Sequence, residues 1–360
     1  MSKPLRIGVV GYGLVGRRHA NIIRRAPDLV LAGVVEPDPQ AQAEAEKAGA
    51  EVYPNISALV SSSPDGVVLA TPTPLHVAQS LECIAACVPV LIEKPIAVSA
   101  LDAVAIIDAA DSAAVPLLVG HHRRHNGMVQ AAKAALEAGD IGDIRAVQTT
   151  CWFYKPDGYF EIAPWRTQKG AGPISVNLVH DVDLLRHFCG EVNSVQAIAV
   201  PSRRGFENED LATAILTFDT GAVATISVSD SIVAPWSWEL TSRENPAYPA
   251  TNQSCYLIGG SLGGMSLPDL RVWRHEAAPD WWSPISASTL TAASRDPLET
   301  QMMHFAAIIR GDESPLVSGL EGLRSLEVVE AVATSSRTGQ AIEISRKEFG
   351  SIQTSGAECV

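Results

Sequence analysis

Near its N-terminus the chain reads Leu5-Arg-Ile-Gly-Val-Val-Gly-Tyr-Gly-Leu-Val-Gly16, and this stretch decides the fold of the first domain. Leu5–Val10 is typical of a buried strand, three glycines follow at once, and residues 17–25 are able to form a helix. In such a unit the first glycine permits a tight turn, the second lets a pyrophosphate approach the backbone, and the third lets helix and strand pack closely. The N–H groups at the start of the helix then face the phosphates.

The next strand, Leu29–Val35, ends in Glu36. This position lies about twenty residues beyond the glycines, where an acidic side chain accepts a hydrogen bond from a ribose 2′-hydroxyl. The glycine turn and Glu36 together predict a dinucleotide site. Because Glu36 would also repel a 2′-phosphate, we expect NAD ahead of NADP. Arg17 and Arg18 leave an alternative, since either is able to reach a phosphate, but solvated helix charges are the more frequent outcome.

Strands continue to alternate with helices up to residue 122. Residues 66–70, 90–92 and 116–120 are predicted strands, and residues 40–47 and 99–111 are predicted helices, with Ser57 as the expected cap of a shorter one. This alternation predicts an α/β, doubly wound parallel sheet of the Rossmann type over residues 1–122.

The strand Val90–Ile92 ends abruptly in Glu93, Lys94 and Pro95. Proline cannot donate to a strand ladder, so Glu93 and Lys94 are left at the carboxyl end of the strand. Ligands bind at that edge of open α/β sheets, which makes Lys94 a candidate proton-transfer group. The alternative is an ordinary salt pair at a strand end.

The pattern changes after residue 122. Residues 144–154, 191–201, 210–218 and 222–230 are predicted strands, the last two joined by a hairpin turn at 219–221, which favours an antiparallel sheet. We therefore expect a second, α+β domain with a large, mostly antiparallel sheet over residues 123–345 and a loose tail over 346–360. The histidines and arginines of residues 121–125 resemble a metal site, but an extended segment would point neighbours to opposite faces, so no metal is predicted.

A predicted helix over residues 174–188 carries the second group of polar candidates. Asn177, His180 and Asp181 lie three and four residues apart and so share one face, although a solvated outer face is the alternative. The preceding loop contributes four residues to the expected mouth of a cleft: Lys155, Tyr159, Trp165 and Arg166. Its two cations are able to bind a carboxylate or to remain solvated loop charges.

Composition limits the classes of partner. The 360 residues carry a net charge of −13, which opposes broad attraction to nucleic acid or to anionic lipid. With 46% hydrophobic and 19% charged residues the chain reads as a soluble globular protein, and the first residues lead almost directly into a strand, so we expect no secretion signal. Six cysteines without metal-ligand spacing fit a reducing cytoplasm.

Taken together, these motifs resemble the Gfo/Idh/MocA family of NAD(P)-dependent oxidoreductases, which includes glucose-fructose oxidoreductase, inositol dehydrogenases and dihydrodiol dehydrogenases. The likeness covers roughly residues 5 to 345. It rests on residues 11–16 with Glu36, the segment 70–76, Glu93-Lys94-Pro95, Gly170-Ala-Gly172 followed by His180 and Asp183, and the closing His304-Phe305 and Ser318-Gly319 segments.

The resemblance implies roles for the matching residues. Lys94 corresponds to the acid/base group, and the family's lysine–proline bond is often cis, which would aim Lys94 into the cleft. The positions expected to bind the cofactor are Gly11, Tyr12, Gly13, Leu14, Val15, Gly16, Glu36, Thr71, Pro72, His76, Glu93 and Lys94. The family's open sheet commonly forms dimer or tetramer contacts, so a homodimer or homotetramer is expected.

One position departs from the family pattern. The family usually has Asp or Asn four residues before its histidine, but here that residue is Val176, and Asn177 stands three before His180. Both spacings share a helix face, so Asn177 is one candidate for this role and Asp181 is the other.

The predicted reaction is oxidation of a secondary hydroxyl on a small cyclic polyol, sugar or glycoside. Hydride passes to NAD while Lys94 accepts the proton, His180 hydrogen-bonds the reacting oxygen or shares the proton, and Asn177 and Asp181 orient a neighbouring hydroxyl. Three alternatives stay open: a dehydrogenase of a carboxylated cyclohexadiene cis-diol, a hydrolase or lyase that uses NAD for a transient oxidation, and a non-catalytic nucleotide-sensing regulator.

Overall fold

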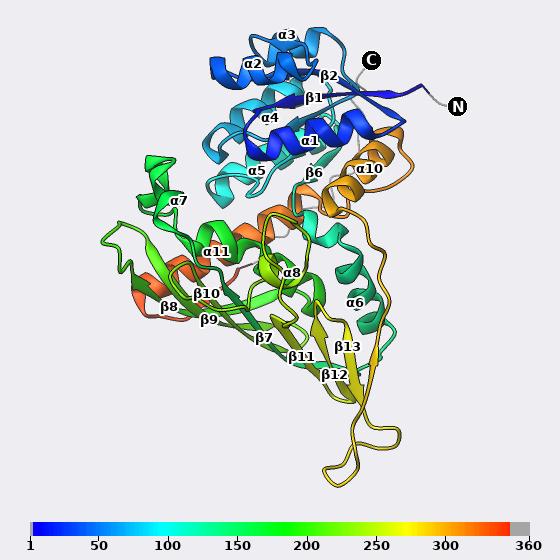
Figure 1. The fold of residues 1–360 in the computed structure, drawn as a ribbon, viewed down its shortest axis with the longest axis vertical. Coiled ribbons are helices and arrows are strands. Elements are labelled where there is room, and N and C mark those ends of the chain that lie inside the picture. Colours follow the sequence, from blue (N-terminus) through cyan, green and yellow to red (C-terminus); the bar gives the residue numbers. More distant parts are fainter. Residues whose placement is uncertain (1–2, 346–360) are drawn as a thin grey trace. The chain divides into compact units, whose positions relative to one another are not determined.

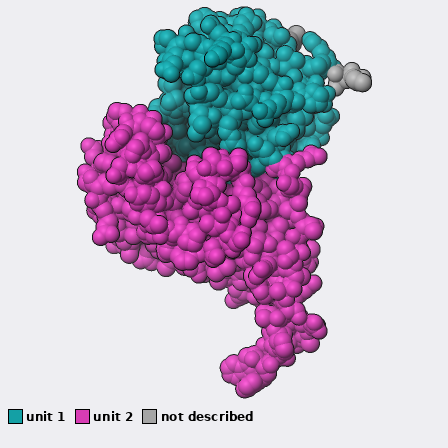
Figure 2. All heavy atoms as spheres, viewed as in Figure 1, with its two compact units in different colours: residues 1–125, 296–326, 348–360 teal, residues 126–295, 327–347 magenta. Residues whose placement is uncertain are grey.

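A computed structural model describes residues 3–345 of the chain, which form two compact units (Figure 2). Of the described residues, the first unit contains 3–125 and 296–326, and the second contains 126–295 and 327–345. Residues 296–326 therefore belong with the N-terminal unit although they follow the second unit in sequence. The expected loose tail, residues 346–360, lies outside the described residues.

The first unit is built on a six-stranded parallel sheet in the order β3-β2-β1-β4-β5-β6 (Figure 1). The strands are β1 (Leu5–Val10), β2 (Leu29–Val35), β3 (Val52–Tyr53), β4 (Gly66–Leu69), β5 (Val90–Ile92) and β6 (Leu117–Val119). The strand order reverses at β1 and β4, which is where open α/β sheets bind ligands. The predicted doubly wound parallel sheet is confirmed.

Helices separate these strands along the chain. They are α1 (Leu14–Arg25), α2 (Pro39–Lys47), α3 (Ile56–Ser61), α4 (His76–Ala85) and α5 (Ala100–Ser112), together with the short 3-10 helix η1 (Thr73–Leu75). The expected cap at Ser57 is wrong, because α3 begins at Ile56 and its cap is Asn55, two residues before Ser57. The side chain of Asn55 accepts a hydrogen bond from the N–H of Ala58, which leaves Ser57 inside the helix with its hydroxyl donating to Glu82 at 2.6 Å.

Helix α10 (Pro297–Arg310) completes the core of the first unit. Met302 and Phe305 on this helix are fully buried and pack with the residues of the parallel sheet. Gly66, at the start of β4, makes room for the helix, because a Cβ there would lie 2.7 Å from Ile309 Cδ1 and 3.1 Å from the Phe305 ring.

The basic segment after β6 differs from the extended conformation that we expected. Residues His122–His125 form a 3-10 helix, η2, in which the Arg124 guanidinium lies 2.8 Å from the Glu321 carboxylate. The ion pair with Glu321, a residue distant in sequence, accompanies a helical turn where the sequence alone predicted an extended segment. Within residues 3–345, no three His, Cys, Asp or Glu side chains gather as a metal ion would require.

The second unit contains a nine-stranded sheet in the order β14-β13-β12-β11-β7-β10-β9-β8-β15. Its strands are β7 (Ile144–Trp152), β8 (Val192–Pro201), β9 (Glu209–Phe218), β10 (Val223–Ser229), β11 (Tyr256–Gly260), β12 (Gly263–Leu267), β13 (Arg271–Arg274), β14 (Ser286–Thr289) and β15 (Ile342–Glu343). Every neighbouring pair is antiparallel except β10 with β7. The predicted large, mostly antiparallel sheet is confirmed.

Helices cover one face of this sheet. Residues of α6 (Gly127–Glu137), α8 (Val179–Cys189) and the later part of α11 (Gly319–Thr338) form one apolar core with inward-facing strand residues (Figure 1). Shorter helices lie in the connections: α7 (Asp157–Glu161), η3 (Pro164–Thr167), the π-helix η4 (Ile174–Leu178) and α9 (Trp238–Thr241). Among residues 3–345, no helix is both long and apolar enough to cross a membrane.

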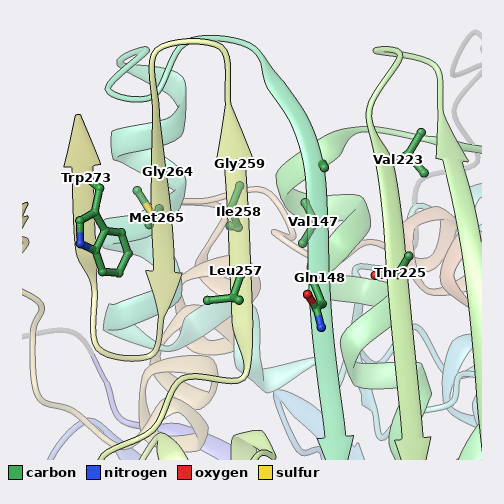
Figure 3. A pocket seen from close by; sticks show the side chains of 11 residues that line it. Val147, Gln148, Val223, Thr225, Leu257, Ile258, Gly259, Gly264, Met265 and Trp273 are labelled. Carbon is green, nitrogen blue, oxygen red and sulfur yellow. The ribbon is translucent and has the colours of Figure 1, made fainter. Parts of the chain in front are cut away.

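The strands alternate between this core and the uncovered face. On that face a shallow pocket extends from β10 across β7, β11 and β12 to β13, and Val223, Gln148, Leu257 and Trp273 are among the residues that line it (Figure 3). Gly259 of β11 and Gly264 of β12 are paired residues that line this pocket without a side chain. Three other tryptophans of the second unit differ in burial. Trp238 lies in the core, whereas Trp281 and Trp282 are more than four-fifths exposed.

Candidate active site

The candidate site in the first unit lies at the carboxyl ends of β1, β4 and β5. The register pairs Val10 with Leu69 and Leu69 with Ile92, so the loops that follow the three strands begin at the same level of the sheet. The glycine turn, the segment beginning at Thr71 and the Glu93–Lys94 pair therefore share one edge. This is the edge at which parallel sheets bind dinucleotides.

The glycine turn has the space that a pyrophosphate requires. Gly11 adopts a left-handed φ of 89°, which glycine tolerates far better than other residues. A Cβ at Gly16 would lie 1.9 Å from the Gly11 carbonyl oxygen, so this glycine is needed for helix α1 to approach the strand. A Cβ at Gly13 would meet no protein atom within 4 Å. Gly13, Leu14 and Val15 are exposed at the start of α1, and the turn fits NAD.

Glu36 is held beside this turn by backbone groups. Its carboxylate accepts hydrogen bonds from the N–H of Tyr12 at 2.5 Å and from the N–H of Asp38 at 2.9 Å. These contacts fix the side chain at the end of β2 as an acceptor. Arg17 instead pairs with Glu44, and Arg18 lies 3.5 Å from Asp296, so both arginines have carboxylate partners within their own unit.

His76 joins the loops after β4 and β5. Its ring is buried, with Nε2 3.0 Å from the Thr71 carbonyl oxygen and Nδ1 3.0 Å from that of Pro95. The Thr71 hydroxyl donates to Gln79 Oε1 at 2.5 Å, and Pro72 is exposed beside it. These contacts give His76 a structural role at the sheet edge, and direct binding of the cofactor by Thr71, Pro72 and His76 stays a prediction.

Glu93 is a buried carboxylate directly before Lys94. Its Oε1 lies 2.7 Å from Nε2 of His19, and its Oε2 accepts from the N–H of Lys94 at 3.3 Å. Burial raises the pKa of Glu93, but the hydrogen bond and charge of His19 and the charges of His122 and Lys94 outweigh it, so the pKa lies below its ordinary value. Lys94 itself is partly exposed, and the Lys94–Pro95 peptide bond is cis, as the resemblance implied.

The polar helix of the second unit begins with a π-turn rather than a regular α-helix. Gly172 lacks the Cβ that would collide with the Glu209 carboxylate, and Glu209 Oε1 accepts from the N–H of Ile174 at 3.0 Å. The π-helix η4 then runs to Leu178, where α8 takes over. Such π-turns are frequent at functional sites. The turn covers the position where the sequence departs from the family spacing.

The three polar residues of this helix are buried, so the alternative of a solvated outer face is wrong. Asn177, His180 and Asp181 are all less than one-tenth exposed. The helix lies against the sheet and is enclosed along nearly its whole length, which leaves it no outer face. Asp181 accepts a hydrogen bond from the hydroxyl of Tyr256 on β11.

Lys155 follows β7 and is 5% exposed, although it was expected at a cleft mouth. Its ammonium donates to Asn177 Oδ1 at 2.8 Å and lies 3.7 Å from Asp230 Oδ2. Arg204 NH1 lies 3.3 Å from the other Asp230 oxygen. Burial lowers the pKa of Lys155 and raises that of Asp230, each against the attraction of the other.

The remaining loop residues gather around one ring. The guanidinium of Arg166 lies 4.0 Å from the centroid of Tyr159 and donates to the Tyr159 carbonyl oxygen at 2.7 Å. Lys155 Nζ is 5.1 Å from the same centroid, whereas Trp165 is half exposed. Lys155, Tyr159 and Arg166 thus form one cluster, and their contact with a substrate stays a prediction.

Four residues that the sequence did not single out belong to these clusters: His19, Arg204, Asp230 and Tyr256. Asp230 carried a usable signal, because it ends a predicted strand as Glu36 does. His19, Arg204 and Tyr256 carried none, since each meets its partner only through tertiary packing.

The fold and the glycine turn define the class of protein, an NAD-binding oxidoreductase. Residues 5–121 match the family model described as "Oxidoreductase family, NAD-binding Rossmann fold", and residues 129–247 match the Gfo/Idh/MocA C-terminal domain. The two matches together cover more than half of the chain, which belongs to the Gfo/Idh/MocA family.

Curated relatives align over nearly the whole chain. D-apiose dehydrogenase of Paraburkholderia graminis is 25% identical over 96% of this chain and 91% of its own length. Inositol 2-dehydrogenase of Rubrobacter xylanophilus is 28% identical over 94% of this chain and 92% of its own. Scyllo-inositol 2-dehydrogenase (NAD(+)) of Bacillus subtilis is 24% identical over 96% and 98%, respectively.

Solved structures agree with this placement. The WlbA dehydrogenase from Bordetella pertussis, solved in complex with NADH and UDP-GlcNAcA, superposes with a TM-score of 0.77 at 27% identity, covering 96% of this chain and all of its own. An oxidoreductase from Agrobacterium radiobacter, 23% identical with a TM-score of 0.79 over 95% of this chain and 98% of its own, shares the fold.

Proposed function

We propose that this oxidoreductase is an NAD-dependent dehydrogenase that oxidises a secondary hydroxyl of a small cyclic polyol, sugar or glycoside. The observation that carries the proposal is that Lys94 stands at the same sheet edge as the glycine turn, at the end of β5. A lysine in this position is able to exchange a proton beside the dinucleotide. Bound NAD supplies the hydride acceptor.

The proposed mechanism divides the work among this chain's own residues. The backbone of the glycine turn holds the pyrophosphate, and Glu36 accepts from the ribose hydroxyls. Lys94 Nζ takes the proton of the substrate hydroxyl, for which its neutral form is required. His180 hydrogen-bonds the reacting oxygen, and Asn177 and Asp181 orient a neighbouring hydroxyl.

A neutral substrate is favoured over the carboxylated cyclohexadiene diol. Binding a substrate carboxylate would require a cation without a counter-charge, but Lys155 is buried against the Asp230 carboxylate. Arg166 donates to the Tyr159 carbonyl oxygen and lies over its ring, but these contacts do not neutralise its charge, so the argument against a substrate carboxylate rests on Lys155. The names of the relatives, which include apiose and inositol dehydrogenases, support a sugar or polyol.

The test is a panel of polyols, pentoses, hexoses, glycosides and nucleotide sugars, each incubated with the protein and NAD and followed by NADH absorbance. We expect at least one neutral ring alcohol to give steady, stoichiometric NADH. Flat traces with every alcohol, despite NAD binding measured by calorimetry, would contradict the proposal and favour a hydrolase or lyase with transient oxidation.

We also propose that the uncovered face of the nine-stranded sheet joins copies of the chain into a homodimer or homotetramer. Apolar side chains on this sheet are unusually exposed for a monomer: Ile198, Val200, Ile215, Val223 and Leu257 range from 41% to 71%. Two of these residues, Val223 and Leu257, also line the pocket of Figure 3. Light scattering after gel filtration should give a multiple of the monomer mass, and Leu257→Glu should lower it, whereas Val98→Glu in the first unit should not. A monomeric wild-type protein would contradict this proposal.

A further inference from the structure

The hydrogen bond between Lys155 and Asn177 determines the orientation of the Asn177 side-chain amide. An ammonium group carries only hydrogen-bond donors, whereas an amide has an accepting oxygen and a donating nitrogen. Lys155 Nζ lies 2.8 Å from Oδ1 of Asn177. The amide oxygen is therefore turned toward Lys155, and the NH₂ group is turned away from it. Within the described part of the chain, Nδ2 of Asn177 has no hydrogen-bond acceptor.

Lys155 is itself held at several points. Its backbone N–H donates to the Asp230 carbonyl oxygen at 2.9 Å, and its carbonyl oxygen accepts from Arg204 NH2 at 2.8 Å. The Asp230 carboxylate faces both the Lys155 ammonium and the Arg204 guanidinium, at 3.7 and 3.3 Å. A buried lysine with both its backbone and its head group fixed has little freedom to release Asn177.

We propose that Lys155 is a positioning residue that fixes Asn177 as a hydrogen-bond donor toward the substrate. This inference rests on the proposed function, in which Asn177 contacts a substrate hydroxyl. The substrate atom that faces Asn177 is then an oxygen that offers a lone pair, and its proton is left for another acceptor. Asn177 thereby selects for a hydroxyl or carbonyl oxygen and against a protonated amine at this position.

The Asn177→Asp substitution separates donation from mere contact. Aspartate keeps an oxygen for Lys155 but has no N–H for the substrate. We expect the KM for the best alcohol of the panel to rise about tenfold, as it does in Asn177→Ala, because a lost hydrogen bond of this kind is worth about one factor of ten. The KM for NAD should change less than about twofold in both variants. An alcohol KM of Asn177→Asp equal to that of the wild type would overturn the proposal.

The Lys155→Met substitution tests whether Lys155 acts through Asn177. We expect a similar rise in alcohol KM, and the double variant Lys155→Met with Asn177→Ala should be no worse than Asn177→Ala alone, because residues in contact are not additive. If the rise in alcohol KM of the double variant equals the product of the two single rises, Lys155 acts independently of Asn177. Lys133→Met on α6, where Lys133 pairs with Glu137 at 3.3 Å, is the matched control and should leave both KM values unchanged.

A measurement without substrate keeps the two proposals apart. Urea unfolding of wild type, Lys155→Met, Asn177→Leu and the double variant forms a cycle, and a coupling free energy is expected between the two sites. Additive effects would overturn the contact and with it the inference. If coupling is found but the wild type oxidises no alcohol, the proposed function has failed, and the substrate role of the pair fails with it.

Discussion

Nε2 of His19 lies 2.7 Å from Oε1 of Glu93, and both side chains are buried within the first unit. This pair connects helix α1, which begins at the glycine turn, with the end of β5, which Lys94 follows. A carboxylate this deeply buried is stable as an anion only with such a partner. His19 therefore holds the residue that precedes Lys94.

This pair predicts a step in the acid stability of the protein without NAD. The pKa of Glu93 in the folded state lies below the ordinary value of about 4.3. The carboxylate therefore contributes stability above about pH 4.3, and that contribution is lost as pH falls through the folded pKa. Urea unfolding measured from pH 7 to pH 3 should show a smaller acid loss in Glu93→Gln than in the wild type. Glu46→Gln, on the exposed side of α2, should behave as the wild type. Identical pH profiles for Glu93→Gln and wild type would contradict the assignment.

Lys94→Ala should remove most turnover and leave NAD binding nearly intact. A positioned acid/base group contributes about 10² to 10⁴ in rate, so kcat should fall by at least about a hundredfold. Lys47→Ala, an exposed lysine at the end of α2, is the control and should keep full activity. The readouts are NADH production with the best alcohol of the panel and calorimetric NAD affinity. Near-native kcat in Lys94→Ala would disprove its role as the base.

Glu36→Ala should weaken NAD binding by about tenfold, which corresponds to one charge-assisted hydrogen bond. The same change removes a negative charge from the ribose end of the site, so the preference for NAD over NADP should narrow. Glu51→Ala, with an exposed side chain just before β3, is the control for a general change of charge. The dissociation constants of both nucleotides measure the effect, and an unchanged NAD to NADP ratio would argue against this role for Glu36.

Local patterns in the sequence were sufficient to predict the first strands and the glycine turn of the first unit. The strand and glycine spacing of residues 5–16 and the position of Glu36 are set by neighbours along the chain, and the structure has β1 and β2 at the bounds predicted for them. The clusters of the second unit depend on packing between distant segments. Lys155, Asn177 and Asp230 meet from three separate elements, and nothing in the pattern around any one of them indicates the other two.

The π-turn at residues 174–178 is a second feature that the sequence did not predict. Hydrophobic periodicity indicates a helix there but does not distinguish a π-turn from an α-turn, because both bury a similar stripe. The signal lay in the mismatch with the family spacing, where Asn177 stands three residues before His180 instead of four. Such a mismatch is a reason to expect irregular backbone.

The glycine turn gives a prediction in which two similar substitutions have different outcomes. A Cβ at Gly16 would lie 1.9 Å from the Gly11 carbonyl oxygen, so Gly16→Ala must push α1 away from the strand and lower the stability of the protein without NAD. A Cβ at Gly13 meets no protein atom within 4 Å, so Gly13→Ala should keep the wild-type melting temperature.

The new methyl group of Gly13→Ala nevertheless occupies the space into which the pyrophosphate is expected to fit. We expect Gly13→Ala to lower NAD affinity by at least about tenfold, the ordinary worth of one displaced charge-assisted hydrogen bond. Thermal unfolding and calorimetry separate the two effects, and unchanged NAD affinity in a stable Gly13→Ala protein would mean that the nucleotide does not bind across this turn.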